Sequence, residues 1–423
     1  MSEESFSSTD YRRAMEALRN GVPNGDAVRV MGCGQPAVEK RFDEQLASVE
    51  KHLSEEKQAP GLLVSGGFGS GKSHLLEFLE HRALQENFVC SRVVISKETP
   101  LYDPAKLYLA AMESATVPNL RGQAIPEIAL KLRPNSPDYE KFYQWAAREA
   151  SNLSQIFPAS LFLHERLNGD PELTERITSF WAGDRLAIAE VRKGLRQIGS
   201  ATMFQLRTTR AAQLAQERFV FAARLMLGAG YKGWVLLIDE VELIGRYSLL
   251  QRAKSYAELA RWLGKVKTQQ VPGLTTVAAI TDDFAAYILD EREDSETIGN
   301  QLRTRGTPEM SALAACAETG MRLIQREALR LDPPGEEMLQ STYSRLKEIH
   351  AAAYNWSPPD IPSAERSLTR AMRSHIRRWI NEWDLKRLYP GTEVTTEEEE
   401  LRPSYAEDTG IEQLSEPEEQ VSD

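Results

Sequence analysis

Apolar residues repeat along the chain with a period that changes from segment to segment, and this period predicts helices and strands. Spacings of three and four, as in Val38, Phe42, Leu46, Val49 and Leu53, are typical of one helix face. Short uninterrupted apolar runs beside glycines are typical of buried parallel strands. We therefore predict helices over residues 11–20, 36–57, 72–84, 248–268, 335–354 and 364–385, and strands over 62–64, 88–95, 234–238, 274–280 and 328–331.

The order of these elements predicts the fold class. Strands separated by helical stretches form parallel sheets covered by helices, so we expect an α/β protein with a doubly wound parallel sheet. Residues 101–230 have an almost entirely helical pattern, with breaks near Pro118, residues 134–137, Pro158 and Pro171. This stretch separates the second predicted strand from the third, and we interpret it as a helical insertion on the sheet.

Composition excludes several classes of protein. Of the 423 residues, 41% are hydrophobic and 27% are charged, which is typical of a chain with a packed core. The chain has no apolar run of about 18 residues, and its polar start lacks a signal peptide's features, so we expect a cytoplasmic protein without a membrane span. Cys33, Cys90 and Cys316 are far apart and lack metal-ligand spacing, which argues against a disulfide scaffold or a zinc site.

The net charge of −11 is concentrated at the C-terminal end. Residues 391–423 hold 12 of the 62 acidic and one of the 51 basic residues, which leaves 50 of each in the other 390 residues. We therefore expect a folded body that is neutral as a whole, followed by a disordered acidic tail. Such a body can still bind nucleic acid through local basic patches.

The most specific chemical signal is a glycine-rich segment between a predicted strand and a predicted helix. It matches the pattern G-x-x-x-x-G-K-[ST]. Glycines let consecutive N–H groups surround a phosphate, and the start of a helix adds partial positive charge. Lys72 is expected to contact the β- and γ-phosphates of ATP, and the Ser73 hydroxyl to bind Mg²⁺. A glycine-rich turn without nucleotide is the disfavoured alternative. The predicted nucleotide-binding residues are Gly66, Gly67, Phe68, Gly69, Ser70, Gly71, Lys72, Ser73 and His74.

A pair of acids follows the apolar run 234–238. Strand ends of this kind form the ligand edge of a parallel sheet. Asp239 is expected to hold Mg²⁺ through its hydration shell, and Glu240 to act as general base towards the attacking water. A solvated strand end is the alternative. Glu242, in the following turn, is expected to form a salt bridge.

A weaker signal follows the apolar run 274–280. A polar side chain at this strand end can orient a water between the acid pair and the γ-phosphate. We assign this role to Thr281, with Asp282 as second choice, and an ordinary strand-end cap is the alternative.

Arginines form the remaining signals. Arg366, Arg370, Arg373 and Arg377 lie within about 60° of one face of the predicted helix 364–385. Arg373 is the candidate for reaching the γ-phosphate from a lid, and the other three are candidates for DNA phosphates, with a solvated basic face as the alternative. An arginine finger from a neighbouring subunit would be Arg303, Arg305 or Arg322, while Arg207, Arg210 and Arg218 are expected to share a solvated face of a further helix.

Together these residues resemble the AAA+ superfamily of P-loop NTPases, in particular its origin-recognition and helicase-loader clade. More narrowly, the chain resembles the ATP-binding proteins of BREX-type phage-defence systems. Besides the motifs above, this resemblance rests on residues 16–24, 229–233, 239–242 and 372–390. It implies ATP and Mg²⁺ as ligands, Arg373 as the lid arginine, and a helicase and DNA as partners. It also implies that the turn holding Val22, Pro23 and Asn24 lies against the adenine base.

Two features depart from that pattern. Lys72 and Asp239 are 167 residues apart, which a minimal AAA+ core does not need. An acidic tail also follows the lid where related loaders carry a winged-helix domain, which argues against sequence-specific DNA reading. We divide the chain into an N-terminal helix and nucleotide-base linker (1–35), a first core segment (36–100), a helical insertion (101–230), a second core segment (231–332), a helical lid (333–390) and the tail (391–423).

The expected function is that of an ATP-hydrolysing AAA+ protein that switches or loads a DNA-processing partner, such as a helicase, in anti-phage defence. A homo-oligomer is compatible with it. The alternative is a nucleotide-held scaffold with negligible turnover that recruits partners through its helical insertion. A small-molecule kinase is a third interpretation, which the acid pair and the arginine-bearing lid disfavour.

Overall fold

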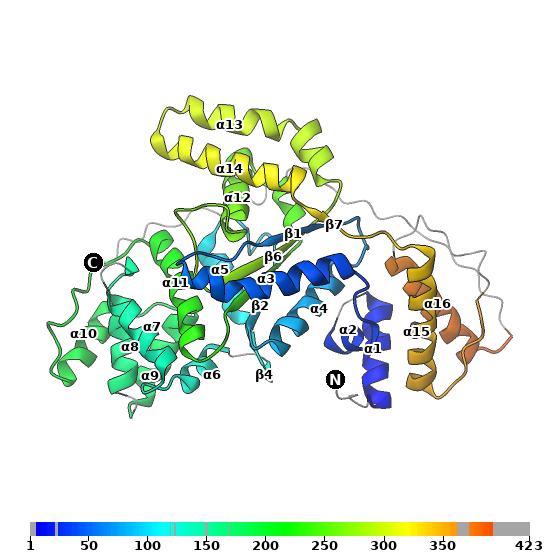
Figure 1. Ribbon diagram of the computed structural model, residues 1–423, viewed down its shortest axis with the longest axis horizontal. Coiled ribbons are helices and arrows are strands. Elements are labelled where there is room, and N and C mark those ends of the chain that lie inside the picture. Colours follow the sequence, from blue (N-terminus) through cyan, green and yellow to red (C-terminus); the bar gives the residue numbers. More distant parts are fainter. Residues whose placement is uncertain are drawn as a thin grey trace.

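A seven-stranded sheet lies at the centre of the computed structural model (Figure 1). The model describes residues 6–21, 24–118, 120–121, 124–148, 151–167, 169–361 and 372–391. The strand order is β4-β3-β2-β5-β6-β1-β7, and the pairs from β2 to β7 are all parallel. The strands are β1 (Leu62–Ser65), β2 (Val89–Val94), β3 (Thr116–Val117), β4 (Leu120–Arg121), β5 (Trp234–Asp239), β6 (Leu274–Ile280) and β7 (Leu329–Arg330).

The predicted α/β class is confirmed, with a sheet that is mostly rather than entirely parallel. Each of the five predicted strands is present within two residues of its expected bounds. The exceptions to parallel pairing are β3 and β4, which form an antiparallel extension beside β2. The sequence did not predict them because two-residue strands are too short to produce an apolar run.

Helices cover both faces of the sheet. Along β5, Val235 and Leu237 pack on the side of α3 (Pro36–Ser54) and α4 (Lys72–Gln85). Trp234, Leu236 and Ile238 alternate with them and pack on the opposite side. The helices that share this second core are α5 (Pro104–Glu113), α11 (Ala211–Gly228) and α12 (Leu249–Trp262).

The helices between α5 and α11 extend from one end of the molecule, on the left in Figure 1. Aromatic rings pack them against α11, including Phe157 on Phe221 with ring centroids 4.9 Å apart. Pro158 lies in the first turn of α8, where a missing N–H is tolerated, and residues 152–155 just before this helix are not helical, so a break is present near Pro158 as predicted. The helices are α6 (Ala124–Lys131), α7 (Pro137–Ala147), α8 (Ile156–Arg166), α9 (Pro171–Ala182) and α10 (Ile188–Gln197).

The expected arginine face of a further helix in this region is not present. Helix α11 begins at Ala211, so Arg207 and Arg210 precede it. Arg218 is buried, donates a hydrogen bond to the Asp184 carbonyl and lies over the Phe180 ring. The prediction failed because the start of the helix was placed too early.

Two helices, α13 (Asp294–Thr304) and α14 (Pro308–Arg326), occupy a stretch for which we predicted no element. They lie above the sheet in Figure 1, against α12. The contact is close, because a Cβ on Gly320 of α14 would lie 2.0 Å from the Tyr256 carbonyl oxygen. A buried ion pair links α12 to α13: the Arg252 Nε atom lies 2.8 Å from the Asp294 Oδ2 atom.

The N- and C-terminal helices form a separate body, on the right in Figure 1. It contains α1 (Ser8–Asn20), α2 (Gly25–Met31), α15 (Glu336–Tyr354) and α16 (Met372–Leu388). These helices share their own core, which includes Met15, Leu346, Trp379 and Trp383. We call this body the lid; it includes α1, although α1 is distant from α15 and α16 in sequence.

The lid also contains a helix, α2, that we did not predict within the nucleotide-base linker before residue 36. Helix α2 lies within it because the Asn24 side chain accepts a hydrogen bond from the Ala27 N–H, and Ala27, Val28 and Val30 are buried. No helix in the described part of the chain is long and apolar enough to cross a membrane.

Candidate nucleotide-binding site

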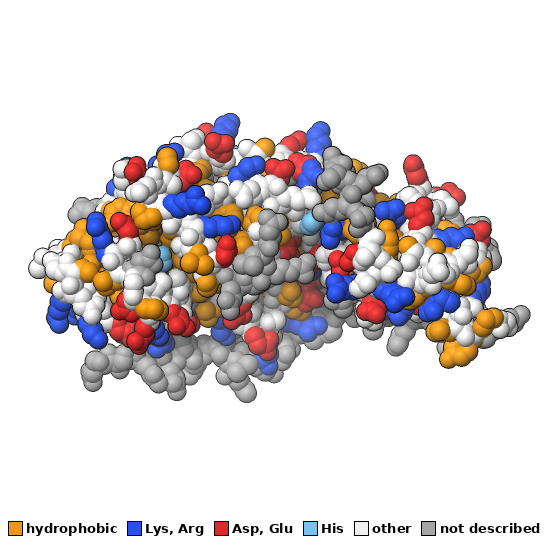
Figure 2. Space-filling model, turned by 90° about the horizontal axis from the view of Figure 1, so that it is seen from below, with side chains coloured by type: hydrophobic (Ala, Val, Ile, Leu, Met, Phe, Trp, Pro, Cys, Tyr) orange, Lys and Arg blue, Asp and Glu red, His pale blue; other side chains and the backbone are white. Residues whose placement is uncertain are grey.

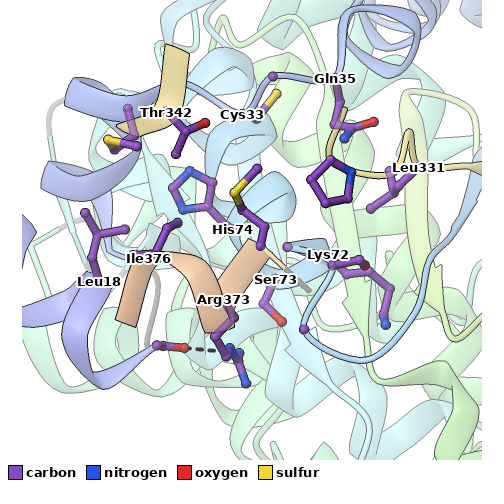
Figure 3. A pocket seen from close by; sticks show the side chains of 18 of the residues that line it. Leu18, Cys33, Gln35, Lys72, Ser73, His74, Leu331, Thr342, Arg373 and Ile376 are labelled. Carbon is purple, nitrogen blue, oxygen red and sulfur yellow. Dashed lines mark hydrogen bonds between the residues drawn. The ribbon is translucent and has the colours of Figure 1, made fainter. Parts of the chain in front are cut away.

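The glycine-rich loop, the ends of the central strands and the lid surround a cavity of about 560 Å³ (Figure 3). Cavities of this size are typical of small-molecule sites. Strand β1 pairs with β6, and β6 pairs with β5, so the segments that follow these strands lie at one edge of the sheet. The cavity is lined by residues 31–35, 68–74, 239, 240, 242, 331, 332 and 334, and by residues of α1, α15 and α16.

The loop after β1 has the shape that its glycines permit. Gly69 and Gly71 adopt left-handed backbone angles, with φ of 74° and 102°. A Cβ on Gly66 would lie 2.6 Å from the Ser70 hydroxyl oxygen, so a larger residue there would displace the loop. Helix α4 starts at Lys72 without a side-chain cap, which leaves the N–H groups of its first turn available beside the cavity. An anion is the ligand that such a helix start favours.

Three side chains of this segment have distinct surroundings. The buried Lys72 donates from Nζ to the Gly66 and Gly67 carbonyls, at 2.8 and 3.2 Å. The Ser70 hydroxyl oxygen is buried and lacks a hydrogen-bond partner among the described residues. His74 reaches from α4 to the Gly32 carbonyl, with Nε2 at 2.7 Å, and burial lowers the pKa of its ring.

Asp239 is almost fully buried at the end of β5, and each carboxylate oxygen accepts a hydrogen bond from the protein. Arg92 donates to Oδ2 at 3.0 Å, and the Glu240 N–H donates to Oδ1 at 3.0 Å. Arg92 also pairs with Glu77 at 2.9 Å. Arg92 was not predicted as a site residue, although a charged residue inside the predicted strand 88–95 was a visible signal.

The two glutamates after Asp239 differ in environment. Glu240 is exposed and has a left-handed φ of 57°, which is uncommon for a residue other than glycine. Partial desolvation of its carboxyl group, and then the nearby Asp239, raise the pKa of Glu240. Glu242 also lines the cavity, and burial raises its pKa to about 6. Its Oε2 atom is buried without a hydrogen-bond partner among the described residues, so the predicted salt bridge was wrong.

The first two polar residues that follow β6, Thr281 and Asp282, differ in their position relative to the glycine-rich loop. Thr281 is buried and is not among the residues that line the cavity. Asp282 pairs with Arg330 at 2.8 Å, and its Oδ1 atom would lie 3.8 Å from a Cβ on Gly67. The role assigned to Thr281 therefore stays a prediction, and Asp282 is the one beside the loop.

Two lid arginines bind the C-terminal end of α1. Arg373 donates from its backbone N–H to the Gly69 carbonyl at 3.4 Å and from Nη2 to the Gly21 carbonyl at 3.2 Å (Figure 3). Arg377 donates to the carbonyls of Arg19 and Asn20, both at 3.0 Å. Arg377, a candidate for binding DNA, thus caps a helix, because cations satisfy carbonyls at helix C-termini. Arg366 and Arg370 lie outside the described residues.

Apolar side chains form the opposite part of the cavity wall. The family resemblance implied base binding by residues 22–24, but Val22 and Pro23 lie outside the described residues and Asn24 caps α2. The lining segment is 31–35, which was not predicted; the glycines at 32 and 34, both with positive φ, were the available signal. The apolar lining residues are Ala17, Leu18, Met31, Cys33, Leu331, Met338, Met372 and Ile376.

The three arginine-finger candidates lie on or next to α13 and α14, and none of them lines the cavity. Arg303 is paired with Glu318 at 2.7 Å. Arg305 and Arg322 are exposed and form no ion pair with another described residue.

A cavity with an anion-binding helix start, several carboxylates and an apolar wall, at the carboxyl edge of a mostly parallel sheet, is typical of nucleotide-binding proteins. The family model described as BREX system ATP-binding protein BrxC/D matches residues 7–130 and 215–382, which is more than half of the chain. The chain therefore belongs to this family of ATP-binding proteins. A comparison with curated proteins found no match. The unmatched residues 131–214 contain α7 to α10.

Proposed function

We propose that the protein is an AAA+-like P-loop ATPase that binds ATP with Mg²⁺ in this cavity, hydrolyses it, and uses the cycle to move the lid. The lid would switch or load a DNA-processing partner, such as a helicase, in phage defence. The observation that carries the proposal is the convergence of three parts on one cavity: the glycine-rich loop, the acids after β5 and Arg373 of the lid.

The residues fit both ligands. The unpartnered Ser70 hydroxyl and the open N–H groups at the start of α4 suit phosphate oxygens, and the apolar wall suits a purine base. Ser73 and Asp239 would hold Mg²⁺, which neutralises phosphate charge during transfer. Both oxygens of Asp239 already accept hydrogen bonds, so its contact with the ion would be through water.

In the hydrolysis step, a water oxygen forms a bond to the γ-phosphorus, and the bond from that phosphorus to the β,γ-bridging oxygen breaks. The proton of the water passes to the Glu240 carboxylate, and ADP leaves with the bridging oxygen. The raised pKa of Glu240 makes its carboxylate a stronger base. Lys72 would leave the Gly66 and Gly67 carbonyls to contact the phosphates.

The lid would respond through Arg373. Its guanidinium donates to the Gly21 carbonyl, while its backbone N–H contacts the loop. A γ-phosphate at the loop would attract this guanidinium and weaken its bond to α1. Binding and hydrolysis would thereby alter how α16 and α1 sit against the phosphate loop. Should the active site be shared between subunits, Arg305 and Arg322 would be the candidate fingers, because Arg303 is already paired.

The test is ATP turnover by the purified protein as a function of its concentration, with and without duplex and single-stranded DNA. Glu240→Gln should retain ATP binding and lose turnover by about 10²- to 10⁴-fold, the usual contribution of a general base. Lys72→Ala should lose ATP binding itself. Full ATP binding and turnover by Lys72→Ala would overturn the proposal.

One observation favours the alternative of a nucleotide-held scaffold with negligible turnover. Arg92 pairs with Asp239 at 3.0 Å, and this cation would compete with Mg²⁺ for the same carboxylate. If that pairing persists with ATP bound, wild type and Glu240→Gln should show equally tight binding and equally low turnover. Arg92→Gln would then raise turnover, whereas an ordinary ATPase would lose activity with this change.

A further inference from the structure

The helical insertion carries a dense group of basic side chains. Residues 185–210 contain six basic residues and one acid, a local charge of +5 in a body that is neutral as a whole. The acid, Glu190, is paired with Arg176 at 3.3 Å. We call the six basic residues the insertion patch: Arg185, Arg192, Lys193, Arg196, Arg207 and Arg210.

All six side chains are exposed, and none forms an ion pair with another residue in the described part of the chain. Arg192, Lys193 and Arg196 lie within about 100° of one side of α10. The Arg192 guanidinium donates to the Leu206 carbonyl at 3.2 Å, which brings the loop holding Arg207 beside the helix. Lys and Arg side chains are visible at the left edge of Figure 2, over the insertion.

The backbone that carries the insertion patch is packed against the core of the insertion. Val191 and Leu195 of α10 and Leu206 of the following loop are buried in the aromatic core of the insertion. Packing therefore fixes the backbone of α10 and of the loop near Leu206, from which the basic side chains project. The patch also lies within residues 131–214, outside the family match, and none of its residues lines the nucleotide cavity.

The chemistry of the patch favours nucleic-acid phosphates over a protein partner. Protein interfaces rely on exposed aromatic or aliphatic anchors, but within 185–210 the one large apolar side chain that is exposed in the structure is Met203. Single strands are held by stacking on aromatic rings, and no exposed aromatic side chain is found in this described segment. Arginine forks suit the phosphates of a duplex.

Residues 391–423 hold 12 acidic residues and one basic residue, so an acidic segment is the alternative ligand that the experiment below must distinguish from nucleic acid. We propose that the insertion patch binds the phosphate backbone of duplex nucleic acid without reading its sequence. This proposal does not depend on ATP hydrolysis, because the two sites share no residue.

The experiment measures the binding of a fluorescently labelled DNA duplex to the full chain by anisotropy, between about 50 and 200 mM salt. The test variant is Lys193→Gln/Arg196→Gln/Arg207→Gln. The matched control, Lys51→Gln/Lys267→Gln/Arg326→Gln, removes the same charge from exposed residues elsewhere. A charge-preserving variant, Lys193→Arg/Arg196→Lys/Arg207→Lys, tests whether charge rather than folding is responsible.

The test variant should bind the duplex at least about tenfold more weakly, and its slope of log affinity against log salt should fall by up to about 3, one for each lost phosphate contact. The control and the charge-preserving variant should stay close to wild type. Equal weakening of test and control variants would overturn the proposal. So would wild-type binding to polyglutamate as tight as to DNA, which would indicate an acidic protein or the acidic residues 391–423. Unchanged ATP affinity in the test variant separates this result from a failure of the ATPase proposal.

Discussion

The cavity that we propose for the nucleotide has two sides, a phosphate side and a lid side, and these are built in different ways. The phosphate side comes from short contiguous segments that follow β1 and β5, and the core of the sheet anchors it. The lid side comes from segments far apart in the chain, and these share a separate core. If the nucleotide cycle moves the lid as proposed, we expect the phosphate side to keep its shape and the lid side to move as one body, because each side has its own core.

Polar contacts at the cavity itself join the two sides. Arg373 contacts Gly69, and His74 contacts Gly32. Gln35 exchanges two hydrogen bonds with the backbone of Asp332, at 2.9 and 3.2 Å. Because these residues line the cavity, a nucleotide bound there as proposed would alter the contacts between the two sides and leave both cores intact.

The largest expected effect comes from breaking the lid core. Trp383 is fully buried, and its indole N–H donates to the Pro359 carbonyl at 3.0 Å. Trp383→Ala should cost about 3–5 kcal/mol, the usual range for loss of a buried tryptophan. Hydrogen exchange should then show lost protection in α1, α15 and α16, with protection retained in the sheet.

The matched variant is Trp262→Ala, which removes a fully buried tryptophan from the sheet core. It should lower protection in β5 and β6. If Trp383→Ala lowers protection in the sheet by the same amount, the lid and the sheet unfold as one unit, and the comparison between two independent sides fails.

The same division explains what could be predicted from the sequence. The phosphate loop and the acids after β5 are each contiguous, so their chemistry and their neighbouring strands were visible together. The lid side depends on α1 packing with α15 and α16, and periodicity within one helix does not show which other helix it contacts. Arg92 was missed because its partner Asp239 lies on another strand, 147 residues away. The arginines at 373 and 377 were predicted on one face, but their binding to the end of α1 depends on tertiary packing.

The second prediction separates the two lid arginines. Arg373→Ala should weaken ATP binding by about 1.5–3 kcal/mol, the usual value for a hydrogen bond to a charged group. Arg377→Ala removes the donor to the Arg19 and Asn20 carbonyls, so it should lower lid stability and leave ATP affinity within a few-fold of wild type. Calorimetric titration with ATP measures the ATP affinity of both variants. Equal losses of affinity would mean that Arg373 acts only by capping α1.

The third prediction concerns pH and Glu242 on the phosphate side. Burial raises the pKa of this carboxyl from 4.5 to about 6, so the folded protein keeps its proton where the unfolded chain has lost it. Stability should therefore fall as the pH rises through this window, and the full cost is present above about pH 6. Glu242→Gln removes the charge and should raise the free energy of unfolding by up to about 2 kcal/mol at pH 8.

Below pH 4.5 the carboxyl is protonated in both states, so the gain from Glu242→Gln should disappear. Denaturant unfolding at the two pH values measures the difference. A loss of stability at pH 8 would show instead that the charged carboxylate has a favourable contact in the folded protein. Such a contact would make the phosphate side more tightly organised than its unpartnered oxygen indicates.

The smallest expected effect tests the base side of the lid. The family resemblance places Asn24 against the base, whereas in the structure its side chain caps α2 by accepting from the Ala27 N–H at 2.7 Å. Loss of an N-cap costs about 1 kcal/mol, so Asn24→Ala should lower lid stability by this amount and weaken ATP binding less than about threefold. Asn24→Ser keeps a capping oxygen and should restore the stability. If Asn24→Ala weakened ATP binding tenfold and Asn24→Ser did not restore it, the amide would be a ligand contact, because a hydroxyl can cap a helix but cannot reproduce an amide's paired donor and acceptor.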